Sequence, residues 1–233
     1  MRGVINRMYK FIIIVILSSL NLFSNAQSIL ATKIPAYGKT IKSFIPKGWI
    51  VLATATGDYN NDGIKDYALV IVDSFEEKMS GDVSRSIIIL KGEKNGFQMS
   101  GSCDSAVLCW NCGGIHGDPF LAIKFDNNKL IVSHYGGSSW KWKLTDKFRF
   151  KNDRWTLIGA TTDYYHSIEY CEKLKDYEGK DFKTVNYLTG ESHFVKISKC
   201  SIVLNKKEKS KIKSLTELEY YNVNRQGSLW DTP

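Results

Sequence analysis

The sequence has few features of an integral membrane, fibrous or disordered protein. Beyond residue 26, none of its apolar runs is long enough to span a bilayer, which takes about 20 residues. With 43% hydrophobic and 24% charged residues, the chain is not a collagen, a coiled coil or a low-complexity protein. Its 233 residues correspond to one domain, or at most two small ones.

Several catalytic signatures are also missing. The sequence contains no Gly-x-Ser-x-Gly elbow, no His-Glu-x-x-His helix and no phosphate-binding glycine loop. Its formal net charge is +8, but residues 1–26 contribute three of these charges, and the segment 205–213 carries five lysines. Removing residues 1–26 leaves a mild +5, and no nucleic-acid-binding motif accompanies this charge. We therefore predict no nucleic-acid partner.

Residues 1–26 have the layout of a signal peptide. Three basic residues precede an apolar block over 11–17, and Ser24 and Ala26 place small residues before a cleavage point at Gln27. The block is short for a membrane anchor, although an uncleaved anchor is the alternative, and no cysteine follows it to carry a lipid. We expect an exported protein, periplasmic or extracellular, that is not integral to the membrane after processing.

Export permits disulfides among the five cysteines of the expected mature chain. We predict two links and one free thiol: Cys109–Cys112, Cys171–Cys200 and Cys103. The Cys-x-x-Cys motif has two further interpretations, a redox motif and a zinc site completed by His116. A redox motif normally begins a helix, which the two glycines that follow disfavour. A zinc site would need further ligands, and no second Cys-x-x-Cys is present.

Most of the mature chain consists of short β-branched and aromatic runs joined by turns rich in Asn, Asp and Gly. These runs predict five hairpins: 49–54 with 67–72, 86–91 with 97–100, 120–125 with 130–135, 140–150 with 154–158, and 184–188 with 193–197. We predict a mainly β fold, an antiparallel meander that forms a partial propeller, a sandwich or an open sheet. The domain is expected over 27–204. A charged tail should follow over 205–233, with a short helix from Ser214 and Glu217 to Tyr221.

The run from Trp140 to Lys151 shows two distinct faces. Its even positions carry mostly aromatic and apolar side chains, whereas its odd positions carry five cations. Alternation with period two places these sets on opposite faces of a strand. We expect the aromatic face in the core and the basic face in solvent. Contact of the basic face with an anionic glycan, a lipid headgroup or a nucleic acid is the alternative.

An acidic loop over 57–66 is the most specific motif. When Asp58 is counted as position 1, oxygen-bearing side chains stand at positions 1, 3, 5 and 9, and a glycine at position 6 permits the tight turn that brings them together. Three carboxylates, one amide and one backbone carbonyl suit Ca²⁺, which prefers oxygen ligands. The predicted ligands are Asp58, Asn60, Asp62, Ile64 (through its carbonyl) and Asp66. The alternative is a simple Asn-Asp-Gly turn that binds nothing. An EF-hand is excluded because Leu69 stands where its final glutamate would be.

With strands on both sides and an acid at position 9, this stretch resembles the calcium-binding loop of FG-GAP and VCBS-type repeats. The resemblance covers 49–72 and implies the same five ligands. Because the motif occurs in a single copy, it implies the loop and its hairpin and not a complete propeller. The wider layout resembles small exported proteins of the Bacteroidetes type, through the segments 111–114, 117–120 and 134–140. That second resemblance implies no particular activity.

A candidate ligand or catalytic cluster lies in the Gly-rich segments. It comprises His116, Asp118, His134, Ser138, Ser139 and Trp140. A serine-type triad would need the base within hydrogen-bond reach of the hydroxyl. The alternative is a structural polar network in which the glycines form turns and bulges beside packed aromatics.

Two classes of function follow from these features. The preferred one is an exported, calcium-stabilised, disulfide-containing binding or structural module without catalytic activity. Its partner would be a glycan or another protein. Outward-facing members of an aromatic set would supply a stacking platform: Trp110, Trp140, Trp142, Trp155 and the tyrosines. The alternative is a secreted hydrolase that uses the His/Asp/Ser cluster.

Overall fold

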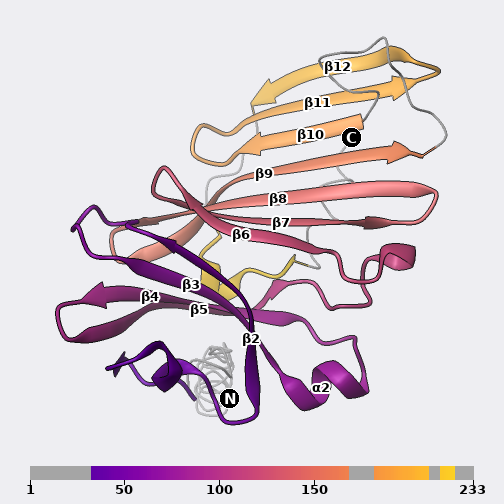
Figure 1. Cartoon of the computed structure of the whole chain (residues 1–233). Helices are drawn as coiled ribbons and strands as arrows, with labels where there is room; N and C mark the ends of the chain where they lie inside the picture. Colours follow the sequence, from indigo (N-terminus) through magenta and orange to yellow (C-terminus); the bar gives the residue numbers. More distant parts are fainter. Residues whose placement is uncertain (1–32, 168–180, 210–215, 224–233) are drawn as a thin grey trace, which may run out of the picture.

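Two antiparallel sheets make up most of the computed structural model, which describes residues 33–167, 181–209 and 216–223 (Figure 1). The first sheet has the order β1-β5-β4-β3-β2, and the second has the order β12-β11-β10-β9-β8-β7-β6. The strands of the first are β1 (Tyr37–Gly38), β2 (Trp49–Gly57), β3 (Asp66–Asp73), β4 (Arg85–Glu93) and β5 (Gly96–Val107). The strands of the second are β6 (Phe120–Asp126), β7 (Lys129–Gly137), β8 (Trp140–Lys151), β9 (Arg154–His166), β10 (Asp181–Asn186), β11 (Glu191–Ser198) and β12 (Ser201–Lys209).

The helices are few and short. They are α2 (Ser74–Met79) and three 3₁₀ turns, η1 (Ile41–Phe44), η2 (Gly114–His116) and η3 (Leu218–Tyr220). Helix α2 lies outside the predicted elements, and the Asp73 carboxylate caps it by accepting hydrogen bonds from the N–H groups of Phe75 and Glu76. In the described ranges, no helix is long and apolar enough to cross a membrane. The predicted signal peptide over 1–26 lies outside the described residues.

All five predicted hairpins are present, and the mainly β prediction is confirmed. The second sheet is an open antiparallel meander, and the first is a meander of β2 to β5 with β1 added beside β5. The fold therefore has the architecture of packed sheets and not of a propeller. Two of the hairpins turn through Asn127-Asn128 and Asn152-Asp153, all four of which have positive φ. A two-residue turn with both φ values positive matches the twist of the flanking strands, and Asn and Asp tolerate it better than most residues.

The segment after residue 200 differs from the prediction. Residues 201–209 form β12, which pairs with β11 from Glu191↔Lys209 to Ser198↔Ser201, although the sequence predicts a charged tail from residue 205. Every residue of β12 is exposed. β12 is an edge strand, which pairs with β11 through its backbone groups and needs no buried side chains. Lysines are well suited to such an exposed edge. In Figure 1, β10, β11 and β12 extend away from the five-stranded sheet.

Residues 216–223 also belong to the folded domain. The predicted helix is reduced to the three-residue turn η3, and the predicted cap Ser214 lies outside the described residues. Leu218, Tyr221 and Val223 are buried in the main core. The β-rich domain therefore does not end at residue 204, because this C-terminal segment supplies apolar side chains to its interior.

The main core lies between the two sheets. It joins Val70, Ile87 and Ile89 of the first sheet to Leu130 and Phe148 of the second. The opposite side chains of β3 and β4, with Phe44 of η1, form a second core on the other face of the first sheet. Both faces of β3 and β4 are thus covered, which explains why 68–72 and 87–90 are uninterrupted apolar runs instead of alternating ones.

The predicted faces of β8 are largely confirmed. Trp142, Leu144, Phe148 and Phe150 lie in or against the main core. The buried Asp146 shares this face, and its carboxylate accepts a hydrogen bond of 2.7 Å from the Tyr221 hydroxyl. Trp140, at the start of the strand, is half exposed.

Candidate functional site

The acidic loop connects β2 to β3 and is folded by its own polar side chains. The Asp58 carboxylate accepts hydrogen bonds from the N–H groups of Asp62 (3.2 Å) and Gly63 (2.9 Å). The side-chain oxygen of Asn60 accepts from the Asp62 N–H at 3.1 Å, and Asp62 accepts from the Ile64 N–H at 2.8 Å. Gly63 has a φ of 80°, a conformation that favours glycine. The side chains at positions 1, 3 and 5 therefore turn inward.

Asp66, at position 9, ties the loop to the sheet. Its side chain is fully buried and accepts hydrogen bonds from the N–H groups of Tyr59 (3.0 Å) and Gly92 (2.8 Å). Burial raises the pKa of the Asp66 carboxyl, and the nearby charges of Asp62 and Asp58 raise it further. The two hydrogen bonds lower this pKa but do not outweigh burial. A negative charge is thus held at a buried position beside other carboxylates, where a cation would relieve the repulsion.

The donor set of the loop is chemically suited to a hard cation, since every predicted ligand offers an oxygen and each carboxylate oxygen has a second lone pair. Across the described ranges, however, no three or more His, Cys, Asp or Glu side chains gather in a group that could hold a metal ion. Calcium at this loop therefore stays a prediction.

The members of the candidate catalytic cluster have other partners. Asp118 pairs with Arg85 through two hydrogen bonds of 2.8 and 2.9 Å and accepts another from the Phe120 N–H at 2.9 Å. The Nε2 atom of the buried His134 accepts from the Leu108 N–H at 3.3 Å. His116 Nε2 lies 2.5 Å from Lys141 Nζ. In the described part of the chain, neither histidine contacts a serine hydroxyl, so the geometry holds no Ser-His-Asp relay.

His134 has an unpaired ring nitrogen in the interior. Its Nδ1 atom is buried without a hydrogen-bond partner among the described residues. Burial lowers the pKa of His134 from 6.5 to about 4. The negative charge of Asp118 opposes this shift, and the positive charge of Arg85 adds to it. The imidazole is therefore neutral at physiological pH and packs against Phe120, with ring centroids 6.1 Å apart.

Arg85 is a buried charged residue that is not among the predicted site residues. Its side chain is only 2% exposed and pairs with Glu77 (2.6 Å) of α2 and with Asp118 (2.8 Å) of the loop before β6. Burial tends to lower the pKa of Arg85, but the hydrogen bonds that its guanidinium donates to Asp118 and Glu77 outweigh burial and raise the pKa. The only signal in the sequence is an arginine at the beginning of an apolar strand. Arg85 joins α2 and this loop to β4.

Glycines let the end of β7 pack closely against Trp142 and against the loop at Gly113. A Cβ atom on Gly136 would lie 2.5 Å from Trp142 Cζ2 and 2.9 Å from the Cα of Gly113. The Gly137 N–H donates to the Gly113 carbonyl at 2.9 Å. These contacts leave no room for side chains and support the structural interpretation of the Gly-rich segments.

The cysteines follow the predicted pattern as far as the structure describes it. Cys109 and Cys112 form a disulfide with a Cα–Cα distance of 5.2 Å. Cys103 is free and buried, and burial raises the pKa of its thiol to about 12. Cys200 is disulfide-bonded, and its predicted partner Cys171 lies outside the described residues. The motif is followed by the short turn η2 and not by an α-helix, a poor setting for a redox-active thiol.

An exposed aromatic platform occurs where β8 begins and β9 ends. The rings of Trp140 and Tyr164 stack with centroids 5.0 Å apart and planes within 4° of parallel. His166 meets the Trp140 ring edge-on at 4.8 Å. Trp140 is 49% exposed, whereas Trp155 is buried in the core and Trp142 is partly buried against it. Among the predicted platform tryptophans, Trp110 is also exposed, and its indole N–H donates to the Glu77 carbonyl at 3.1 Å.

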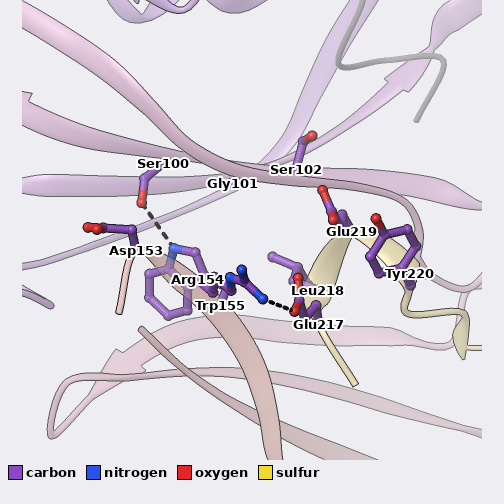
Figure 2. Close-up of a pocket in the computed structure, with 10 residues that line it drawn as sticks. All are labelled: Ser100, Gly101, Ser102, Asp153, Arg154, Trp155, Glu217, Leu218, Glu219 and Tyr220. Atoms are coloured by element: carbon purple, nitrogen blue, oxygen red, sulfur yellow. Dashed lines mark hydrogen bonds and ion pairs between the residues drawn. The ribbon is translucent and has the colours of Figure 1, made fainter. Parts of the chain in front are cut away.

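A pocket of about 450 Å³ lies between β5, the start of β9 and η3 (Figure 2). The Ser100 side chain enters it from β5, and an ion pair of 2.7 Å between Arg154 and Glu217 lies across from this strand. The volume is within the range of small-molecule sites, about 300–1,000 Å³. No sequence motif marks this pocket, because its lining comes from three segments far apart in the chain.

Comparisons with protein-family models, curated proteins and solved structures find no match. The class that the fold defines is a mainly β protein of two open antiparallel sheets with a disulfide-closed loop.

Proposed function

We propose that the protein is an exported, calcium-stabilised binding module without catalytic activity, and that its Trp140 platform binds a glycan. The observation that carries this proposal is the stacked and half-exposed pair Trp140–Tyr164. A flat indole whose outer surface is open to solvent offers a sugar ring an apolar face at little cost in side-chain entropy.

The surroundings of the platform support a role in binding more than one in catalysis. Two of the candidate catalytic groups are engaged by other side chains, with Asp118 bound to Arg85 and His116 to Lys141. The Tyr164 ring stacks on one face of the Trp140 ring, and His166 contacts the Trp140 ring edge-on. The Trp140 ring therefore loses little conformational entropy when a ligand binds, which favours affinity.

The calcium-stabilised part of the proposal rests on the resemblance to FG-GAP and VCBS-type loops and on the inward side chains of Asp58, Asn60 and Asp62. Export rests on the N-terminal pattern and is consistent with the disulfide Cys109–Cys112. Calcium would be structural in this function, because it would neutralise the carboxylates and hold the β2–β3 hairpin.

Affinity electrophoresis in gels containing xylan, glucomannan, soluble chitosan or hydroxyethyl cellulose tests the platform. We expect retardation by at least one polysaccharide and a loss of about tenfold or more in affinity for Trp140→Ala, as for a central tryptophan anchor. Trp140→Phe should retain part of the binding. The matched control is Phe75→Ala, an exposed aromatic on α2. Equal retardation of wild type and Trp140→Ala, or retardation by none of the polysaccharides, would contradict the proposal.

A further inference from the structure

The pocket of Figure 2 continues into a second one along β5. The second pocket has a volume of about 400 Å³, and its lining includes Tyr59 and Asn60 of the acidic loop and Phe150 of β8. Ser100 and Asp153 line both pockets, which therefore adjoin. Together they form one groove, the β5 groove, that extends from η3 to the acidic loop.

The hydroxyl of Ser100 is an oriented hydrogen-bond donor at the centre of this groove. Its oxygen accepts from the Tyr59 hydroxyl at 2.6 Å and from the Trp155 indole N–H at 3.1 Å, the second of which Figure 2 shows. These bonds use both lone pairs of the oxygen, so only its proton is left to bond. In the described part of the chain, no protein group accepts that proton, so an acceptor must come from solvent or a ligand.

Both partners of Ser100 are held rigidly. Tyr59 and Trp155 are buried, and their rings meet edge-on with centroids 4.7 Å apart. The Tyr59 N–H is itself bound to Asp66 at 3.0 Å. The direction of the Ser100 donor is therefore set by the core and by the acidic loop.

The walls of the groove supply acceptors and one aromatic surface. Asp153 lies beside Ser100, while Glu219 and Tyr220 lie toward the other end of the pocket in Figure 2. Tyr220 is 58% exposed. The Arg154 guanidinium pairs with Glu217, and Lys91, which lines the second pocket, pairs with Glu93 at 3.1 Å. The carboxylates of Asp153 and Glu219 therefore leave the groove with a negative balance. This balance disfavours an anionic ligand.

We propose that the β5 groove is a second binding site, distinct from the Trp140 platform, that takes a neutral oligosaccharide with Ser100 as its central hydrogen-bond donor. A sugar hydroxyl or ring oxygen accepts from Ser100, and neighbouring hydroxyls donate to Asp153 and Glu219. The Tyr220 ring covers an apolar sugar face. Two adjoining pockets suit a chain of several sugar units better than a monosaccharide.

Titration calorimetry with neutral hexasaccharides tests the groove: cellohexaose, xylohexaose, mannohexaose and N-acetylchitohexaose. Hexagalacturonate serves as the anionic probe. We expect one of the neutral probes to bind and hexagalacturonate to bind at least tenfold more weakly. Ser100→Ala should lower the affinity about two- to tenfold, the value of one hydrogen bond.

Two further variants keep the proposal testable if Ser100→Ala does not fold. Asp153→Asn removes a charged acceptor, and Asn tolerates the φ of 58° at this position. Tyr220→Ala removes an exposed ring. Each should weaken binding of the neutral probe, whereas the control Phe75→Ala, at an exposed aromatic outside both sites, should leave it unchanged. The proposal is overturned if no neutral hexasaccharide binds, if hexagalacturonate binds equally well, or if the groove variants bind like wild type. Loss of binding in Trp140→Ala alone would overturn it in favour of the platform.

Discussion

Replacing Asp66 tests the role of the buried carboxylate that ties the acidic loop to β4. Asp66→Ala leaves the N–H groups of Tyr59 and Gly92 without their acceptor. Each buried donor left unpaired costs about 1–3 kcal/mol, so we expect a loss of about 2–6 kcal/mol in the free energy of unfolding. Asp66→Asn keeps one acceptor oxygen and should cost roughly half as much.

Equilibrium urea denaturation in the presence of a chelator measures this loss without a contribution from metal. Tryptophan fluorescence is a suitable signal because Trp155 packs against Tyr59. Asp126→Ala is the matched control, since Asp126 is an exposed carboxylate in another hairpin and its removal should change stability by less than about 0.5 kcal/mol. A loss below about 1 kcal/mol for Asp66→Ala, or a larger loss for Asp66→Asn than for Asp66→Ala, would refute the reasoning.

The pH dependence of the same variants tests the charge at Asp66. Burial raises its pKa in the folded chain above the ordinary 3.8, so protonation favours the folded state. The resulting stability is fully present below pH 3.8 and is lost as the pH rises through the raised pKa. With chelator, wild type should therefore gain stability relative to Asp66→Asn as the pH falls. Saturating Ca²⁺ should reverse this trend, because a bound cation favours the carboxylate.

Three further predictions concern calcium, His134 and Arg85. Calcium at about 100 times its Kd should stabilise the chain by about 2.7 kcal/mol, or about 5–11 °C in Tm, and Asp62→Ala should remove the effect; equal melting with calcium and chelator at matched ionic strength would contradict this. Folding lowers the pKa of His134 from 6.5 to about 4, so about 3 kcal/mol of the free energy of unfolding should be lost as the pH falls from 6.5 to 4. His134→Gln should lose less over the same range, and identical pH profiles of unfolding for the two proteins would contradict this prediction. Arg85→Met should cost about 3–5 kcal/mol in the free energy of unfolding because it leaves the largely buried Glu77 carboxylate without its partner, and a loss under about 1 kcal/mol in urea denaturation would refute the buried pairing.

The hairpins could be predicted because their determinants are local. The alternation in 140–151 and the Asn-Asn and Asn-Asp turns specify strand faces and reversals within a few residues of sequence. The inward side chains of the acidic loop follow in the same way from the spacing of Asp58, Asn60 and Asp62. The disulfide Cys109–Cys112 was predictable because only two residues separate its cysteines.

The features that escaped prediction depend on partners distant in the chain. The strand character of 205–209 comes from pairing with β11, and its charged composition alone indicates a solvated tail. The ion pairs of Arg85 require residues 8 and 33 positions away. The candidate Ser-His-Asp cluster does not assemble for the same reason, because Asp118 and His134 bond instead to Arg85 and to the Leu108 N–H, 33 and 26 residues away.

The sequence by itself determined an antiparallel β protein with an acidic turn and a short disulfide loop, because turn residues, periodicity and close cysteine spacing act over a few bonds. Only the tertiary structure decided which aromatic rings are exposed and where a groove lies. Trp140 is open because it stands at a strand end beyond the core. Ser100 is an oriented donor because Tyr59 of the acidic loop and Trp155 of β9 meet at its oxygen. Such convergence depends on how two sheets pack, which no local pattern specifies.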